Sequence, residues 1–182
     1  MDINTLALLT SLEREIKLKL NLDLCIAGGA VRDLVHVKPF KDVDLEVLNH
    51  GIVNDMLLSD WVCDVYNNLI SIGATNISLN SSSCEDLVDS ELLVVIKFTY
   101  RETDFDLLVQ SSNPKTPEEA VSVYDMTINQ YSLYNGEVKN HVGFNVGDDV
   151  KPTGKTFSKD RFYRIRSKYP EYNFDAVEPF VV

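Results

Sequence analysis

Helix-like and strand-like segments both occur in this sequence of 182 residues and predict one domain of mixed α and β structure. Residues 3 to 20 carry leucine or isoleucine at steps of three and four, the period of an amphipathic helix. Residues 22 to 26 and 92 to 100 are apolar runs of strand length. The chain is long enough to bury one core and too short for a second full domain.

The elements between these segments can be predicted in order. The first apolar run ends at a diglycine turn, after which a short helix begins at Ala30. Asp42 to Val47 alternates acidic and apolar residues, which predicts a strand, and residues 51 to 72 are mostly helical in pattern. We expect a polar loop over Asn80 to Ser90. Two-residue turns predict hairpins at Arg101-Glu102 and at Asn135-Gly136.

The diglycine turn has the features of an anion site. Gly28 and Gly29 lie between a predicted buried strand and a helix N-terminus. Without a Cβ atom, each glycine lets a ligand approach the backbone, and the helix-end N–H groups favour negative charge. The turn therefore predicts that an anionic group such as phosphate binds there.

Acidic residues share one face of each of two predicted strands. The strand period of two places Asp42, Asp44 and Glu46 together, either as a solvated face or as carboxylates that hold a divalent cation. On the strand after Arg101-Glu102, Asp106 is our choice for a third ligand, and Asp104 stays open because it has the same parity. If the two strands are neighbours, three carboxylates meet, which is the minimum for two-metal phosphoryl transfer.

These motifs resemble those of the nucleotidyltransferase superfamily that includes DNA polymerase beta. The G-G-A-V-R-D of Gly28 to Asp33, followed by D-V-D, is most similar to the head domain of bacterial-type tRNA nucleotidyltransferases and poly(A) polymerases. Tyr124 to Asn129 (YDMTIN) resembles their R-R-D-F-T-I-N-A segment, so the likeness covers about residues 21 to 140. It implies an α/β fold in which helices cover a mixed sheet of about five strands. Residues 1–150 would form the head domain and 151–182 a basic, aromatic tail on the same domain.

The resemblance also implies a reaction and its residues. A nucleoside monophosphate would pass from an NTP to an acceptor hydroxyl with Mg²⁺ or Mn²⁺, Asp42 and Asp44 holding both ions and Asp106 helping to activate the hydroxyl. Gly28 and Gly29 would cradle the phosphates. Arg32 would contact the triphosphate or pair with Asp33. The nucleotide-binding set is thus Gly28, Gly29, Arg32, Asp33, Asp125 and Asn129, the last two contacting the sugar or only holding the backbone.

The chain also departs from the family pattern. Val123 and Tyr124 replace the paired arginines that help to hold the nucleotide, and Lys159 to Arg164 is one residue out of step with the family's base-reading E-D-x-x-R helix. The helical body that grips tRNA has no counterpart in this sequence, and a partner chain could supply it. An RNA 3′ end is our first choice of acceptor. A protein hydroxyl is the alternative, and an inert binding module with this fold is the non-enzymatic one.

Charge and composition limit the partners. The net charge is −11, yet residues 151 to 168 hold seven of the 17 Lys and Arg residues and one acid, Asp160. Because the body is acidic, we expect no extended duplex binding. The basic stretch would either touch a triphosphate or an RNA end, or form a solvated or acid-pairing helix packed against the body. The tail aromatics would stack on bases or anchor the tail. Without a long apolar run or a signal-like start, we expect a soluble, cytoplasmic protein with no membrane contact.

Overall fold

The computed structural model describes residues 2–52, 55–81, 91–145, 147–153, 156 and 158–182. In these residues, one mixed sheet has the strand order β3-β4-β5-β2-β1-β6-β7. Its strands are β1 (Asp23–Ala27), β2 (Val43–Leu48), β3 (Thr75–Ser81), β4 (Leu92–Tyr100), β5 (Thr103–Gln110), β6 (Tyr131–Tyr134) and β7 (Glu137–Asn140). The helices are α1 (Ile3–Leu20), α2 (Gly29–Val35), α3 (Asp55–Ser71), α4 (Pro117–Ser122) and α5 (Lys159–Lys168), with 3₁₀ turns at Thr127–Asn129 and Glu178–Phe180.

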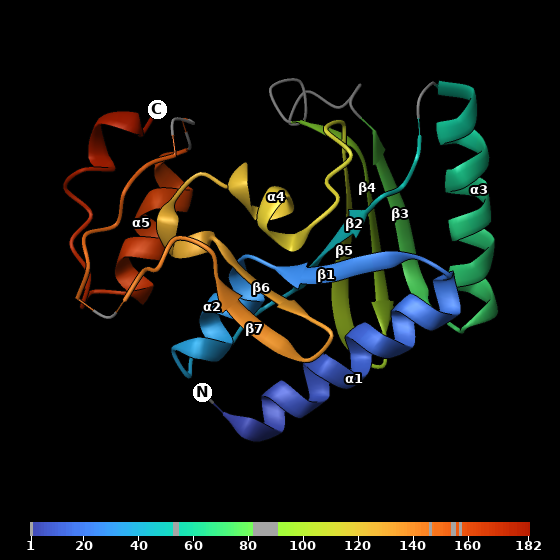
Figure 1. Ribbon diagram of the computed structural model, residues 1–182, viewed down its shortest axis with the longest axis horizontal. Helices are drawn as coiled ribbons and strands as arrows, with labels where there is room; N and C mark the ends of the chain where they lie inside the picture. Colours follow the sequence, from blue (N-terminus) through green and yellow to red (C-terminus); the bar gives the residue numbers. More distant parts are fainter. Residues whose placement is uncertain (1, 53–54, 82–90, 146, 154–155, 157) are drawn as a thin grey trace.

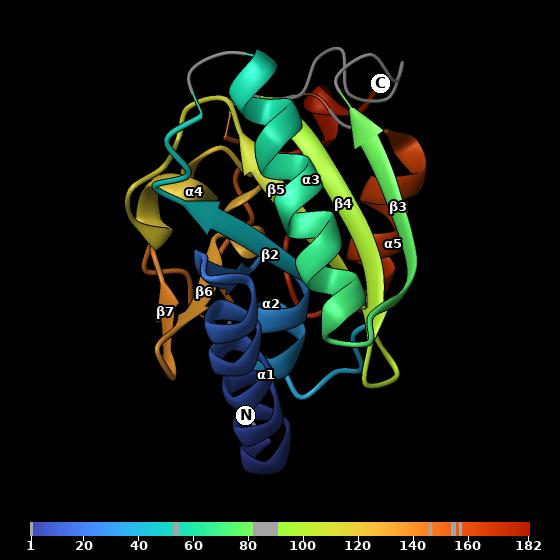
Figure 2. The same cartoon turned by 90° about the vertical axis from the view of Figure 1, so that its right-hand side faces the viewer.

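The helices lie on both sides of this sheet. Figures 1 and 2 show α3 and α5 on opposite sides, and α1 extends along the same side as α3. None of the helices in the described part of the chain is long and apolar enough to cross a membrane. The mixed sheet with helices on both sides confirms the predicted α/β class.

The sheet has seven strands, although we expected about five, and β3 at one edge was not predicted. Its sequence, TNISLNS, is mostly polar, which suits an edge strand that is covered on one side only. Asn80, expected in a polar loop, pairs with Val95 of β4 near the end of this strand. Residues 82 to 90 of the expected loop lie outside the described residues.

Helix α1 begins and ends where its capping residues place it. The Asp2 side chain accepts hydrogen bonds from the backbone N–H groups of Asn4 and Thr5, at 3.3 and 3.2 Å. At the other end, Asn21 adopts a left-handed conformation and its N–H bonds to the Lys17 carbonyl. Between these caps, one face of the helix is buried at Leu9, Leu12, Ile16 and Leu20.

Both predicted hairpins form, and their turns determine the strand register. Arg101 and Glu102 both have positive φ, at 48° and 62°, and join β4 to β5. Asn135 and Gly136, at 52° and 83°, join β6 to β7. In the first hairpin this turn pairs Tyr100 with Thr103, so that Lys97 lies opposite Asp106.

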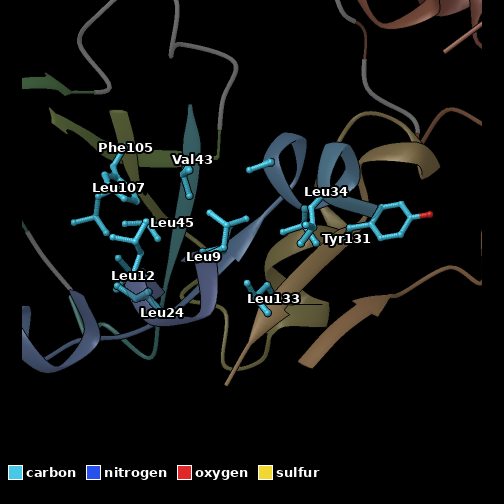
Figure 3. Packing of buried hydrophobic residues seen from close by; sticks show 14 of the residues in the cluster. Leu9, Leu12, Leu24, Leu34, Val43, Leu45, Phe105, Leu107, Tyr131 and Leu133 are labelled. Atoms are coloured by element: carbon cyan, nitrogen blue, oxygen red, sulfur yellow. The ribbon is translucent and has the colours of Figure 1, made fainter. Parts of the chain in front are cut away.

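Strand β2 lies between β1 and β5 and separates the core from a cleft. It runs parallel to β5, with Val43 opposite Phe105 and Leu45 opposite Leu107. These four side chains are fully buried, and Figure 3 shows Leu9, Leu12 and Leu24 packed beside them. The even-numbered residues of the two strands point to the other face, since side chains alternate along a strand.

The tail packs on that other side through aromatic residues. Phe162 and Ile165 of α5 are buried, as are Tyr169, Tyr172 and Phe174 beyond it. The Tyr172 hydroxyl lies 2.6 Å from Nε2 of His36, just after α2. Tyr169, Tyr172 and Phe174 therefore anchor the tail, which is one of the two roles that the sequence left open for its aromatic residues.

Truncation of Leu45 tests the central position of β2. We expect Leu45→Ala to lower the free energy of unfolding by about 2–5 kcal/mol, because it leaves a cavity in a closely packed core. Leu18→Ala is the control, since Leu18 of α1 is 76% exposed, and should change stability by less than about 0.5 kcal/mol. Urea denaturation followed by circular dichroism measures both. Equal effects would contradict the assignment of Leu45 to the core.

Candidate active site

A cleft of about 690 Å³ lies between the sheet and α5, a volume typical of small-molecule sites. It is lined by the start of α2, by β2 and β5, by residues 123 to 125 and by α5. The cleft brings together all the residues predicted for catalysis and nucleotide binding, namely Gly28, Gly29, Arg32, Asp33, Asp42, Asp44, Asp106, Asp125 and Asn129.

The two acidic strands are neighbours. In the parallel β2–β5 pairing, Asp44 lies opposite Asp106, and on the other side Asp44 pairs with Ala27, directly before the glycine turn. Asp42 lies one residue before β2, and its side chain is 46% exposed and 3.9 Å from Lys41 Nζ. The conditional expectation that β2 and β5 would be adjacent is thus met.

Asp104 and Asp106 have different surroundings, although they share a strand face. Asp106 lines the cleft and is ion-paired with Lys97 Nζ at 2.5 Å. Asp104 is exposed, accepts a hydrogen bond from the Thr99 hydroxyl at 2.7 Å and does not line the cleft. The geometry therefore favours Asp106 as the third carboxylate.

The carboxylates do not form a ready metal site. Among the described residues, no group of three or more His, Cys, Asp or Glu side chains is arranged to hold a metal ion. Lys97 neutralises Asp106, and Asp42 is half exposed, so the close arrangement is the pair Asp44 and Asp106. That Asp42, Asp44 and Asp106 bind a metal stays a prediction.

Asp44 nevertheless has negative charge around it that is only partly balanced. Burial raises the pKa of the Asp44 carboxyl to about 7, and the nearby carboxylates of Asp42 and Asp106 act in the same direction. The guanidinium groups of Arg161 and Arg32 oppose this rise. A cation at this point would stabilise the ionised form, because it would reduce the repulsion between the carboxylates.

Gly28 is required by its conformation and by a neighbouring ring. Its φ is +62°, and a Cβ atom there would lie 2.6 Å from Cε2 of Tyr124 and 3.4 Å from an oxygen of Asp44. Among the described residues, a Cβ at Gly29 would have one neighbour within 4 Å, Nη2 of Arg32 at 3.6 Å, which is ordinary contact. The ring of Tyr124 therefore lies against the turn that the sequence assigns to phosphate.

Tyr124 is held by a buried carboxyl. Its hydroxyl donates to Glu46 Oε1 at 2.8 Å, and Nε2 of Gln110 donates to Glu46 Oε2 at 2.9 Å. Burial raises the pKa of Glu46 to about 8, against the lowering effect of these hydrogen bonds and with a smaller rise from Asp44. This polar cluster closes the cleft beside Asp44.

Arg32 and Asp33 are engaged with each other and with the tail. The buried guanidinium of Arg32 contacts Asp33 Oδ1 at 2.9 Å, donates to the Tyr169 hydroxyl at 3.0 Å and also bonds Asn129. Asp33 accepts from Lys168 and from Tyr169 as well. Arg32 therefore pairs with Asp33, which is one of its two expected roles, and its contact with a triphosphate stays a prediction.

Asp125 and Asn129 are joined to α5 at the far wall of the cleft. Nδ2 of Asn129 donates to Asp125 Oδ1 at 2.7 Å, and Arg161 Nε donates to Asp125 Oδ2 at 2.6 Å. Arg164 of the same helix also lines the cleft, and no hydrogen bond or ion pair of its side chain is present among the described residues. Helix α5 thus supplies cations where Val123 and Tyr124 replace the expected arginines.

Sequence reasoning missed three contributors to the site. Lys97 was detectable, because a two-residue turn at Arg101-Glu102 places it opposite Asp106. The contact of Tyr124 with Gly28 and the bond from Gln110 to Glu46 had no sequence signal, since each joins segments far apart in the chain.

Comparison with known proteins gives a likeness of fold. No protein-family model and no curated protein sequence matches the chain. A CCA-adding enzyme in complex with ATP has a similar structure, with a TM-score of 0.56 and 15% identity over 99% of this chain and 42% of that one. A tRNA-processing enzyme in an apo form gives 0.49 and 16% over 79% and 34%. The Thermotoga maritima CCA-adding enzyme complexed with tRNA gives 0.43 and 17% over 73% and 27%.

The first of these likenesses carries the argument about the fold. At 15% identity, it shows that the chain has the nucleotidyltransferase-like fold, and the predicted resemblance is confirmed at that level. The chain spans less than half of the length of each of the three structures. What those larger proteins bind is a matter for proposals about this chain.

Alanine substitutions test whether Gly28, unlike Gly29, is required by its positive φ and by the neighbouring Tyr124 ring. We expect Gly28→Ala to lower the free energy of unfolding by about 2–5 kcal/mol, because it combines backbone strain with a clash against Tyr124. Gly29→Ala, with ordinary contacts, should be neutral or slightly stabilising. Thermal and urea denaturation of the two variants measure the difference. If Gly28→Ala matches Gly29→Ala in stability, the described packing of Tyr124 is wrong.

Glu46 makes stability depend on pH. Its pKa is about 8 in the folded protein and near 4.5 in an unfolded chain, so its contribution is fully present below about pH 4.5 and is lost as pH rises through 8. Glu46→Gln removes this titration. We therefore expect the variant to gain stability relative to wild type by about 1–4 kcal/mol between pH 5 and 8.5.

The measurement is urea denaturation of the wild type and the variant across that pH range. Glu137→Gln is the control, because the side chain of Glu137 is 70% exposed on β7. A constant difference between wild type and Glu46→Gln at all pH values would contradict the raised pKa of Glu46.

Proposed function

We propose that this protein is a nucleotidyltransferase that moves a nucleoside monophosphate from an NTP to the hydroxyl of an RNA 3′ end. The observation that carries the proposal is the position of Asp44 opposite Asp106 on the cleft side of the sheet, directly beside the Gly28 turn. Nothing in folding demands two adjacent carboxylates there, because both lie on the sheet face turned away from the main core. Their placement beside a helix N-terminus suits phosphate chemistry.

In this proposal, each side chain at the cleft has a defined task. The acceptor hydroxyl attacks the α-phosphorus, the bond to the β-phosphate oxygen breaks, and pyrophosphate leaves. Asp106 accepts the proton of the hydroxyl. Gly28 and Gly29 would present the start of α2 to the phosphates, while Asp125 and Asn129 would contact the sugar.

Asp42, Asp44 and Asp106 are the proposed ligands of Mg²⁺ or Mn²⁺. Carboxylate oxygens are the donors that these hard cations prefer. Burial, and then the neighbouring carboxylates of Asp42 and Asp106, raise the pKa of Asp44, and a bound cation would favour its ionised form. Such ions, when bound, neutralise charge that develops on the phosphates. The three carboxylates therefore have the right donor atoms for these ions.

Positive charge for the triphosphate comes from α5 in this proposal. Arg161, Arg164 and Lys168 all line the cleft, and the side chain of Arg164 has no ion-pair partner among the described residues. Arg32 is turned toward Asp33 and Tyr169, so we assign it to holding the wall of the cleft. ATP is the first nucleotide to test, since a structure of similar fold was solved with it.

Transfer of label tests the function directly. We expect the wild type, incubated with Mg²⁺ or Mn²⁺ and α-labelled NTPs, to label RNA, and Asp44→Asn to lower the rate on the order of a thousandfold. Asp104→Asn is the matched control and should transfer normally, because Asp104 does not line the cleft. Stability of Asp44→Asn should equal or exceed that of wild type, since the buried charge is removed.

The acceptors distinguish the candidate activities. Bulk RNA, a tRNA and a cell lysate are offered separately, and the products are resolved by size and by protease or nuclease digestion. Label on a polypeptide would show that the acceptor is a protein hydroxyl and not RNA. Full activity of Asp44→Asn would refute the assignment of Asp44 to the active site. If the wild type transfers no label from any NTP, the result would support an inert module in which Asp106 stays ion-paired with Lys97.

A further inference from the structure

Helix α5 presents two charged sides, and only one of them belongs to the cleft. Arg161, Arg164 and Lys168 follow one another at steps of three and four and line the cleft. A helix advances 100° per residue, so Lys159, Tyr163 and Arg166, at steps of four and three, lie on a different side. All three of these residues are exposed. We call Lys159, Tyr163 and Arg166 the outer stripe.

Tyr163 has a solvent-facing ring, which the core does not use. It is 55% exposed, whereas Tyr169, Tyr172 and Phe174 of the same tail are buried. Its ring lies edge-on to Phe162, with the ring centroids 5.2 Å apart. The buried Phe162 thus supports Tyr163 from one side and leaves the rest of its ring accessible.

The cations of the outer stripe are weakly engaged. Arg166 is 3.8 Å from Glu178, with side chains 44% and 59% exposed, and a pair this open contributes little to stability. The Lys159 side chain makes no ion pair or hydrogen bond within the described residues. Residues 151 to 168 hold seven of the 17 basic residues of the chain and one of its 28 acids, so positive charge is concentrated in this segment.

We propose that the outer stripe binds the single-stranded RNA segment next to the reacting 3′ end. Tyr163 stacks on a base, and Lys159 and Arg166 contact phosphates on either side of it. This inference rests on the proposed function, since α5 is the wall between the outer stripe and the cleft.

The combination of an exposed ring and flanking cations favours this partner. An acidic peptide would use the cations but has no general need of an exposed tyrosine, whereas every base has a face that stacks on one. Duplex RNA would need phosphate contacts over a wide surface, and the acidic remainder of the chain would repel it.

Binding of a labelled oligonucleotide tests the outer stripe without catalysis. Fluorescence anisotropy with a single-stranded RNA of about ten nucleotides, without NTP or divalent cation, measures affinity for full-length protein. We expect Tyr163→Ala to weaken binding about tenfold and Tyr163→Phe to keep it, since stacking needs the ring. Lys159→Gln combined with Arg166→Gln should also weaken binding and lower the salt slope by about 1.4, for two lost phosphate contacts.

Tyr66→Ala is the matched control, because Tyr66 of α3 is 38% exposed on the other side of the sheet. No measurable RNA binding by the wild type, unchanged binding by Tyr163→Ala, an equal loss in Tyr66→Ala or tighter binding of duplex RNA would each overturn the proposal. RNA binding that depends on the stripe, together with no nucleotide transfer, would support this inference and refute the proposed function. The binding experiment and the transfer experiment therefore test the outer stripe and the proposed function independently.

Discussion

The parallel pairing of β2 with β5 is the constraint on which the rest of this structure depends. It places Val43 and Leu45 against Phe105 and Leu107 in the core, and the same register puts Asp44 opposite Asp106 in the cleft. Because side chains alternate along a strand, a slip of one residue would turn the carboxylates into the core and expose the apolar residues. Burial of the apolar face thus determines the position of the acids.

The acids in turn shape the electrostatics of the cleft. Asp44 and Glu46 lie on the same face of β2, and burial raises the pKa of both carboxyls. Lys97 pairs with Asp106 and Arg161 pairs with Asp125, so two of the acidic side chains that line the cleft each have a cationic partner. A ligand that brings both phosphates and cations would satisfy this arrangement better than either alone.

The tail is a structural part of this cleft. Arg32 and Asp33, which the motif assigns to nucleotide binding, bond to Tyr169 and Lys168, and Arg161 of the tail reaches Asp125. One network of buried and partly buried hydrogen bonds therefore joins the start of α2 to α5. Such a network is strong where its members are satisfied, since unpaired polar groups are costly in the interior. The wall that carries the cations is held by the motif itself.

The sequence by itself determined the local features: the α1 helix, the face shared by Asp44 and Glu46, and the turns at Arg101-Glu102 and Asn135-Gly136. These follow from backbone sterics and periodicity within a few residues, and they extend to the pairing of Lys97 with Asp106. Tertiary structure alone decided that β3 completes an edge, that Asp106 rather than Asp104 lines the cleft, that Tyr124 packs on Gly28 and that Arg161 reaches Asp125. Those contacts join segments distant in the chain, and the packing of the whole core selects them, because no local pattern encodes which distant surfaces meet.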